Sequence, residues 1–199
     1  MEIIPREFYT QNAEKVARGL LGKVMIRRFG NELLMGRIVE TEAYYGLKDP
    51  ASRAFTTPKM AESMWLEGGR TFVYMVHSNW LLNIVTGKEG NPQAVLIRAI
   101  EPIKGSDIMK KYRETEGFDL TNGPGKLTQA LKLSKDHHNI SVYNEKSEVM
   151  IMDLGIVDDF KISSSNRIGV KKDLKKKLRF FIKGSKWVSK GKMIAQKFY

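Results

Sequence analysis

Two glutamates two residues apart, Glu40 and Glu42, have the type and spacing that could do chemistry in this chain of 199 residues. They lie in segment 36–44, which is rich in Ile, Val, Thr and Tyr and therefore predicts a β-strand. Side chains alternate along a strand, so both carboxylates are expected on one face, framed by Ile38 and Tyr44. A half-buried carboxyl group beside an aromatic ring loses hydration, which raises its pKa and suits it to general acid or base catalysis.

A second interpretation of this strand involves no chemistry. Charged strand residues are usually solvated, so Glu40 and Glu42 also fit a surface ladder in which each pairs with a Lys or Arg of the next strand. Arg98 bears on the choice, because it stands inside the near-continuous apolar segment 93–101. A guanidinium within such a strand is costly unless it has a partner.

The residue types that are missing or rare exclude several kinds of site. The chain has no cysteine, which excludes disulfides, thiolate catalysis and cysteine-bound zinc. Its three histidines are His77, His137 and His138. A histidine metal site is therefore not expected, and we expect neither a structural metal nor a cofactor.

The charge of the chain points to an anionic partner. The formal net charge is +12, for which nucleic acid is the commonest partner and a membrane surface the weaker alternative. No apolar run approaches the roughly 20 residues that span a bilayer. The first residues, Met-Glu-Ile-Ile-Pro-Arg, lack the apolar core of a signal peptide. We therefore expect a cytoplasmic protein that meets nucleoid or nuclear DNA.

The rest of the chain predicts a mixed fold. A strand at 23–29 and the turn Gly30-Asn31 make an antiparallel hairpin with 36–44. Residues 45–70 form a long irregular connection, which in a compact domain is often functional. The further elements expected are helices at 11–21, 60–66, 106–113 and 127–133, a hairpin of strands 71–77 and 80–85 turned at Ser78-Asn79, strands at 93–101 and 178–182, and two short strands within 141–162 around Asp158-Asp159. This pattern predicts an α+β fold, a curved and mostly antiparallel sheet surrounded by helices, in a single domain over 1–199.

Two stretches could contact phosphate. Asn122-Gly-Pro-Gly-Lys126 leads into a predicted helix, whose free N–H groups and dipole can hold an anion, although the P-loop spacing is absent. From Arg167 onward the charge becomes one-signed and includes Lys171 and Lys172. Such runs are usually solvated faces, but this one agrees with the charge of the whole chain, which favours a phosphate-contacting surface.

A carboxylate beside a tyrosine, an aromatic hairpin and a basic surface together meet the needs of an enzyme that acts on a base in duplex DNA. Such an enzyme must extrude the base from the stack. It then needs a wedge to fill the gap, aromatic faces to hold the base, and cations for the backbone. It also needs a carboxylate to activate water.

Longer motifs follow one another along nearly the whole chain. They are Gly36-Arg-Ile-Val-Glu-Thr-Glu-Ala-Tyr44, Val73-Tyr74 with Asn83, Val95-Leu-Ile-Arg-Ala-Ile-Glu-Pro102, Gly123-Pro-Gly-Lys-Leu-Thr-Gln-Ala-Leu131, Arg167-Ile-Gly-Val170, and Leu178-Arg-Phe-Phe-Ile-Lys-Gly184 with Trp187-Val-Ser189. This series resembles the alkyladenine DNA glycosylase family, the 3-methyladenine DNA glycosylases of the mammalian type. The resemblance implies a compact monomer whose protruding β-hairpin enters the minor groove of double-stranded DNA.

The resemblance also implies a role for each residue of the site. Glu42 would be the general base that activates the attacking water, and Arg98 would help to hold that water and the carboxylate. Tyr44 and Tyr74 would stack on opposite sides of the flipped base. Asn83 would reach the base edge and discriminate against normal guanine, whose exocyclic amino group would clash.

Two positions depart from the family pattern, and Glu40 has no role in it. His77 stands where the wedge is typically Tyr. Alternatively, His77 is a turn histidine without that role, and Met75 or Trp80 is the wedge. Arg53 stands at a pocket position often occupied by His. Because a guanidinium only donates hydrogen bonds, we expect Arg53 to favour lesions that present acceptors, such as hypoxanthine, over 1,N6-ethenoadenine.

The reaction that follows from the resemblance is base-excision repair of a damaged purine, of the 3-methyladenine, 7-methylguanine, hypoxanthine or ethenoadenine class. It would leave an abasic site without strand cleavage. The residues expected to contact DNA are His77, Lys126, Arg167, Lys171 and Lys172. Two other classes stay open: a basic nucleic-acid-binding module, which leaves Glu42 and Arg98 unexplained, and a hydrolase of free nucleosides, which has little use for a wide basic surface.

Overall fold

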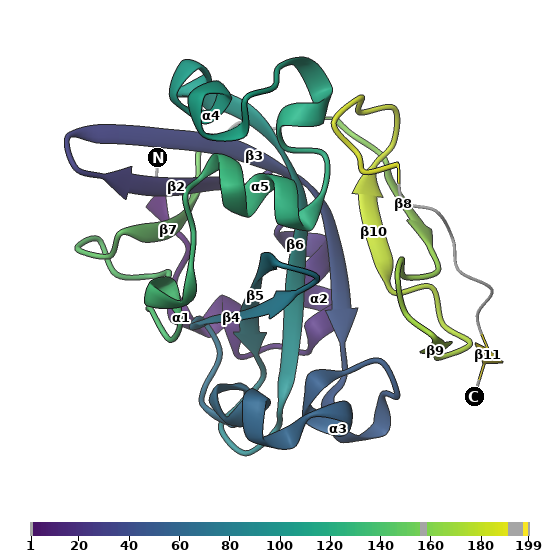
Figure 1. The fold of residues 1–199 in the computed structure, drawn as a ribbon. Coiled ribbons are helices and arrows are strands. Elements are labelled where there is room, and N and C mark those ends of the chain that lie inside the picture. The colour runs from purple at the N-terminus through teal and green to yellow at the C-terminus, as the bar shows by residue number, and fades with distance from the viewer. Residues whose placement is uncertain (1, 156–158, 191–196, 199) are drawn as a thin grey trace.

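A sheet of nine strands runs through the computed structural model, which describes residues 2–155, 159–190 and 197–198 (Figure 1). Within these residues the strand order is β1-β7-β2-β3-β6-β5-β4, with β10 paired to β3 and β8 paired to β10. All of these pairs are antiparallel. The predicted α+β class with a mostly antiparallel sheet is therefore confirmed.

The elements of this sheet and its surroundings alternate along the chain. The strands are β1 (Glu2–Ile3), β2 (Val24–Phe29), β3 (Glu32–Tyr44), β4 (Thr71–Val76), β5 (Asn79–Thr86), β6 (Gln93–Lys104), β7 (Val149–Asp153), β8 (Ile162–Ser165), β9 (Lys172–Asp173), β10 (Arg179–Ile182) and β11 (Lys197–Phe198), the last paired in parallel with β9. The α-helices are α1 (Arg6–Tyr9), α2 (Ala13–Gly19), α3 (Arg53–Thr56), α4 (Ser106–Arg113) and α5 (Pro124–Ala130), and the 3₁₀ helices are η1 (Gly46–Lys48), η2 (Pro58–Trp65), η3 (Gly117–Leu120) and η4 (Lys135–His137).

The long strand β3 pairs with β6 through three register shifts, of which the two on either side of Glu40 cancel each other. Ile38 lies opposite Ile100, Glu40 opposite Ala99, and Thr41 opposite Ile97. Val39 on β3 and Arg98 on β6 are thereby left without a direct partner, as in β-bulges, which redirect side chains. Ile38 and Glu40 therefore do not share a face of the sheet, although the simple alternation predicted for 36–44 places them together.

The helices cover the two faces of the sheet (Figure 1). In α2, the side chain of Asn12 caps the first turn by accepting from the N–H of Lys15 at 3.0 Å. The buried side of this helix lies against β3, where the Thr41 hydroxyl donates to the Ala17 carbonyl at 2.9 Å. On the other face, α5 begins at Pro124, three residues earlier than predicted, because proline is well suited to the first helical turn.

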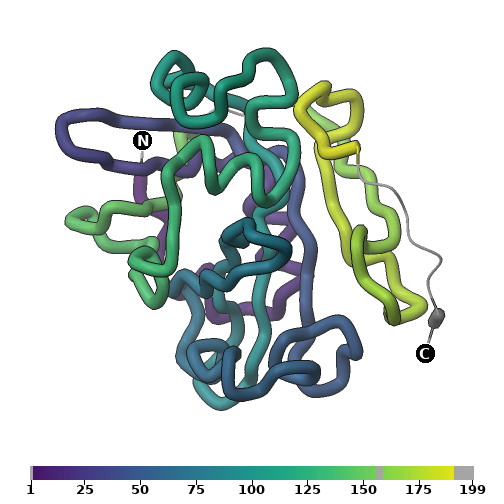
Figure 2. The backbone as a smooth tube through the Cα atoms, viewed as in Figure 1, coloured from purple at the N-terminus to yellow at the C-terminus, as the bar shows by residue number. Residues whose placement is uncertain are grey.

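The hairpin β4–β5 turns at His77 and Ser78, one residue earlier than predicted. Both have positive φ, 45° and 62°, as a two-residue type I′ turn requires. Figure 2 shows the hairpin passing beside the α5 segment. This approach is close, because a Cβ added at Gly125 would lie 2.8 Å from the Cβ of Asn79. The glycine therefore lets α5 support the hairpin next to its tip.

The connection 45–70 is not one loop with one short helix, as predicted, but contains η1, α3 and η2. A separate apolar cluster lies beneath it and includes Met64, Phe72 and Val85, with Tyr74 packed against it. This cluster fixes the connection against β4, β5 and β6.

Some expectations fall outside what the structure can test. Asp158 of the predicted turn lies outside the described residues. The assignment of 1–199 to a single domain stays a prediction. Among the described residues, no helix is both long and apolar enough to cross a bilayer.

Candidate active site

The Glu42 carboxylate lies at the centre of the site and is fully buried. Its Oε1 accepts from the backbone N–H of Ile168 at 2.7 Å and lies 3.3 Å from Nη1 of Arg98. Its Oε2 accepts from the Tyr44 hydroxyl at 2.8 Å. The predicted pairing of Glu42 with Arg98 is confirmed, and the surface-ladder interpretation is wrong because neither Glu40 nor Glu42 has exposed surface.

Arg98 owes its place in an apolar strand to two carboxylates. Its Nε donates to Oε1 of Glu40 at 2.7 Å, its Nη1 faces Glu42, and its Nη2 donates to the Ser189 hydroxyl at 3.2 Å. Burial by itself would lower the pKa of Arg98, but the charges of Glu42 and Glu40 outweigh it and raise the pKa. The guanidinium therefore stays charged.

Glu40, to which the sequence assigns no role, accepts more hydrogen bonds than Glu42. Its Oε1 accepts from Nε of Arg98 and Nε of Arg179, both at 2.7 Å, and from the Ser189 hydroxyl at 2.8 Å. Its Oε2 accepts from the Ser189 N–H at 2.6 Å. Burial favours the neutral acid, but Arg98 and Arg179 overcome it and lower the pKa of Glu40. The raised pKa expected of a buried carboxyl is thus wrong for Glu40.

Tyr44 is held on one side by Arg167. The guanidinium carbon of Arg167 lies 4.5 Å from the centroid of the Tyr44 ring. Arg167 is fully buried and binds Asp49 and Asp173 at 2.6 Å each. The pKa of the Tyr44 hydroxyl is raised well above its ordinary value, first by burial and then by the charge of Glu42. The hydroxyl therefore stays protonated and donates to that carboxylate.

This geometry corrects the prediction that Arg167 contacts DNA. A side chain with no exposed surface and two carboxylate partners is not accessible to a phosphate. Arg167 instead ties the connection 45–70, through Asp49, to the segment that precedes β10. The neighbouring N–H of Ile168 then reaches Glu42.

Four residues expected to bind a base line one small cavity. They are Tyr44, Arg53, Tyr74 and Asn83, and the walls are completed by Ala51, Met64, Phe72 and Ala94. The Arg53 guanidinium lies 4.8 Å from the centroid of the Tyr74 ring. Phe72 and Tyr74, both on β4, pack against each other with 4.9 Å between their ring centroids. Asn83 donates from Nδ2 to the Phe72 carbonyl at 3.1 Å.

The cavity is small, and Tyr44, Arg53 and Tyr74 at its walls stay partly exposed. Its volume is about 10 Å³, which holds about one water molecule and no purine. Burial raises the pKa of the Tyr74 hydroxyl, against the opposing influence of Arg53 and Asn83, so the phenol is neutral here. A base can enter only if Arg53 or Tyr74 moves.

A larger, open cleft of about 820 Å³ lies on the other side of Arg98. Arg98 and Ser189 line it, together with three lysines, Lys126, Lys186 and Lys190. Lys126 is partly engaged, because its Nζ binds Asp119 at 2.5 Å and Asn122 at 2.9 Å. The acidic residues Glu116 and Asp119 line the cleft as well, but its four cations outnumber them, and we call it the basic cleft. Arg98 therefore lies between the Glu42 carboxylate and the basic cleft.

Comparisons with known proteins show to which family this chain belongs. A family model described as methylpurine-DNA glycosylase matches residues 7–186. This chain belongs to the methylpurine-DNA glycosylase family. Relatives from Clostridium botulinum, Bdellovibrio bacteriovorus and Clostridium novyi are 37%, 36% and 38% identical to it, and each carries the provisional name 3-methyladenine DNA glycosylase. The alignments cover 94%, 94% and 96% of this chain and 99%, 99% and 100% of those relatives.

Membership of the methylpurine-DNA glycosylase family makes this chain a DNA-binding hydrolase of base-excision repair. Among the described residues, no group of three or more His, Cys, Asp or Glu side chains could hold a metal ion.

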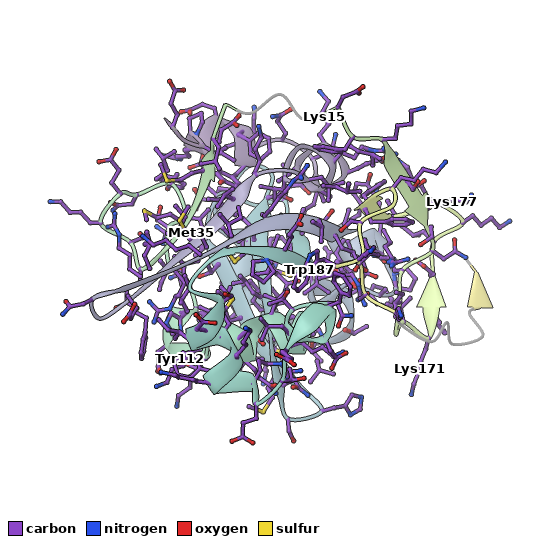
Figure 3. All side chains as sticks on the ribbon, turned by 90° about the horizontal axis from the view of Figure 1, so that it is seen from above. Lys15, Met35, Tyr112, Lys171, Lys177 and Trp187 are labelled. Atoms are coloured by element: carbon purple, nitrogen blue, oxygen red, sulfur yellow. The ribbon has the colours of Figure 1, made fainter. Side chains whose placement is uncertain are left out.

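The remaining residues expected to contact DNA lie at the surface. His77 is exposed at the hairpin tip, and so are Lys171 and Lys172 beyond β8. Figure 3 shows Lys171 and Lys177 projecting at one end of the molecule, with Met35 and Tyr112 at the other. The contacts of His77, Lys171 and Lys172 with DNA stay predictions.

The alternative wedge residues differ in their surroundings. Met75 is 47% exposed, whereas Trp80 is half-buried and packs against the main core. Its carbonyl also accepts from the Thr128 hydroxyl of α5 at 2.7 Å. Trp80 is therefore a less suitable wedge than His77 or Met75.

Sequence reasoning missed the groups that come from the C-terminal segment. The Ile168 N–H donates to Glu42, and Arg179 and Ser189 donate to Glu40. Ile168 and Ser189 stand in motifs that the resemblance picked out, Arg167-Ile-Gly-Val170 and Trp187-Val-Ser189. Their position in these motifs is the signal that could have pointed to them. The residue type of Ile168 gives no further indication, because its contact with Glu42 comes from the backbone N–H.

Proposed function

We propose that this protein removes a damaged purine from double-stranded DNA, as a monomer, by flipping the nucleotide and hydrolysing its N-glycosidic bond with a water that Glu42 activates. The observation that carries the proposal is the position of Glu42. Its carboxylate contacts both Tyr44, whose ring lines the small cavity, and Arg98, which borders the basic cleft. A nucleotide entering from the cleft with its base in the cavity would have its sugar beside Glu42.

The reaction then follows from this placement. Glu42 takes a proton from the water as the water oxygen bonds to C1′. The C1′–N bond breaks, and its electron pair leaves with the purine. The negative charge of Glu42 also stabilises the oxocarbenium-like centre that develops at C1′. An alkylated cationic purine leaves as a neutral base, whereas hypoxanthine needs acid assistance as well. The products are an abasic site and a free base, without strand cleavage.

Stacking between Tyr44 and Tyr74 holds the base. Each stacked face is worth roughly 1–3 kcal/mol. Extrusion of a nucleotide costs a few kcal/mol and is easiest for a weakly paired lesion, so the balance itself selects for damage. Asn83 stands at the edge of the same cavity and would contact the base edge, where it would exclude the amino group of guanine.

Arg53 sets the lesion preference within this proposal. It can offer donors but no acceptor to a base edge. Hypoxanthine presents acceptors there, so its excision is expected to be faster than that of 1,N6-ethenoadenine. The pair of rates measured on otherwise identical duplexes tests this point, and equal or reversed rates contradict it.

The function itself is tested by excision assays on duplexes that each contain one modified purine. Wild-type protein should release the lesion, and Glu42→Gln should bind the same duplex but release at least about 100-fold less. Undiminished release by Glu42→Gln removes Glu42 from the role. Borohydride treatment during the reaction tests the water mechanism, because a covalent protein–DNA adduct would mean an amine nucleophile. If the protein instead hydrolyses free nucleosides, and its binding to duplex DNA does not depend on salt, a nucleoside hydrolase is favoured.

A further inference from the structure

Beside the carboxylate that the proposed function uses lies a second one that it does not use. Glu40 has no exposed surface and touches neither the small cavity nor the basic cleft. It lies between Arg98 and Arg179 and accepts from both at 2.7 Å. We infer that Glu40 is a positioning residue that holds Arg98 back from Glu42 and neutralises the charge of Arg98, so that the Glu42 carboxylate can take a proton from water. This inference rests on the proposed function.

The geometry of Arg98 carries the first part of the inference. Its Nε lies 2.7 Å from Oε1 of Glu40, whereas its Nη1 lies 3.3 Å from Oε1 of Glu42. The shorter contact fixes the plane of the guanidinium through its inner nitrogen. Arg98 therefore supports Glu42 from one side without closing a tight bidentate pair, which would occupy oxygen lone pairs that the water needs.

The charges of the cluster carry the second part. Arg98 and Arg179 bring two positive charges, and Glu40 and Glu42 bring two negative charges, all nearly excluded from solvent. Without Glu40, the cluster would hold two arginines and one carboxylate. A positive excess stabilises the ionised form of a carboxylate and makes it a weaker base. The other polar and charged groups around Glu42 are Tyr44, Tyr74, the Ile168 N–H, and Arg167 with its partners Asp49 and Asp173.

Ser189 secures Glu40 in this position. Its N–H and hydroxyl donate to the two carboxylate oxygens of Glu40, and its hydroxyl accepts from Nη2 of Arg98. Ser189 also lines the basic cleft. The C-terminal segment thus completes the site by fixing a residue that does not touch the substrate.

The main test compares wild type with Glu40→Gln in single-turnover excision at a series of pH values. We expect Glu40→Gln to bind the lesion duplex as wild type does and to excise about tenfold more slowly. The acid limb of its pH–rate profile should move to lower pH, because the charge of Arg98 then falls entirely on Glu42. A crystal structure of the variant should show Nη1 of Arg98 closer to Glu42 than 3.3 Å. Wild-type rate, profile and Arg98 position together would overturn the inference.

A charge-compensating variant separates electrostatics from packing. Glu40→Gln combined with Arg179→Gln removes one charge of each sign, so the acid limb should return toward the wild-type position. A merely structural Glu40 predicts instead that the double variant is worse and its profile unrestored. Arg179→Gln alone leaves a negative excess, so its acid limb should move to higher pH. This single variant decides the matter if Glu40→Gln does not fold.

Failure of the inference is distinguishable from failure of the proposed function. A wild-type protein that excises no lesion contradicts the proposed function, whatever Glu40 does. The crystallographic comparison still decides whether Glu40 holds Arg98 away from Glu42. A wild type that excises, with a Glu40→Gln variant indistinguishable from it, refutes the role of Glu40 alone.

Discussion

The hydroxyl of Tyr44 donates to Oε2 of Glu42 at 2.8 Å, so the aromatic ring that lines the cavity and the buried carboxylate are joined in one unit. The two residues are neighbours on one face of β3, and Arg167 covers the Tyr44 ring from the side. A stacked base and the carboxylate would therefore keep a fixed geometry relative to each other. A mutation that removes the hydroxyl and keeps the ring can test the two parts of this unit separately.

Tyr44→Phe should reduce the excision rate and leave lesion binding intact. A hydrogen bond to a charged group is worth about 1.5–3 kcal/mol, so we expect a loss of about tenfold or more in single turnover. Tyr45→Phe is the control, because its hydroxyl donates to Glu14 instead. A Tyr44→Phe variant with the wild-type rate would show that the hydroxyl does not position Glu42.

Arg53→His should change which lesions are excised. An imidazole can accept a hydrogen bond from the amino group of an adenine lesion, so the ratio of the 3-methyladenine rate to the hypoxanthine rate should rise. Arg53→Lys keeps a charged donor and should keep the wild-type preference. Both ratios come from competition assays with the two duplexes in one tube, and an unchanged ratio in Arg53→His would mean that this residue does not read the base edge.

His77→Ala should weaken flipping rather than general DNA binding. The exposed imidazole at the hairpin tip would stack in the gap that the flipped base leaves, and loss of one stacked ring is worth about 1–3 kcal/mol. Fluorescence of 2-aminopurine placed beside the lesion reports the flipped state. Met75→Ala is the matched comparison, and a loss confined to that variant would assign the wedge to Met75.

The two kinds of cation near β9 should respond differently to mutation. Lys171→Met should weaken binding to damaged and sound duplexes equally and reduce the salt slope of binding by about 1. Lys15→Met is its control, because Lys15 is also exposed but lies at the top of the side-chain view, whereas Lys171 lies at the lower right (Figure 3). Arg167→Met should instead destabilise the fold by about 3–5 kcal/mol, measured by urea unfolding, because it leaves Asp49 and Asp173 buried without a partner. A stable Arg167→Met variant with weakened DNA binding would restore the original assignment.

Stability should fall at acid pH partly through Glu40. Its pKa is lower in the folded protein than the ordinary value of 4.5, so the folded state favours the ionised form. This contribution is full above about pH 4.5 and is lost as the pH falls through the folded pKa. Unfolding free energies of Glu40→Gln should therefore vary less over that acid range than those of wild type. Parallel curves would show that Glu40 does not supply the pH dependence.

The parts of the fold and site that sequence predicted follow from local rules or from a requirement for a partner. The longer strands and the helices α2, α4 and α5 follow from periodicity. The Arg98–Glu42 pair follows because a guanidinium in an apolar strand needs a carboxylate. The family motifs, which the match over residues 7–186 supports, pointed to Tyr44, Tyr74, Asn83 and Arg53. The shared cavity then shows that they lie together.

The parts that sequence did not predict depend on contacts between distant segments. Arg167 was grouped with the lysines that follow it, yet burial between Asp49 and Asp173 gives it a different role. The cancelling register shifts at Val39 and Arg98 leave no sign in residue type, because they arise from pairing between two strands. Ser189 reaches Glu40 across 149 positions of sequence, a contact that no local pattern contains.

Arg53 and Tyr74 leave almost no free space in the cavity, and this affects how well the DNA-free protein binds free purines. A molecule that needs the open form binds more weakly in proportion to how seldom that form occurs. A loose purine brings no sugar–phosphate contacts to offset the opening, whereas a nucleotide in DNA does. Nucleobases at cellular concentrations should therefore leave the enzyme uninhibited, and each released product should depart without competing for the next lesion.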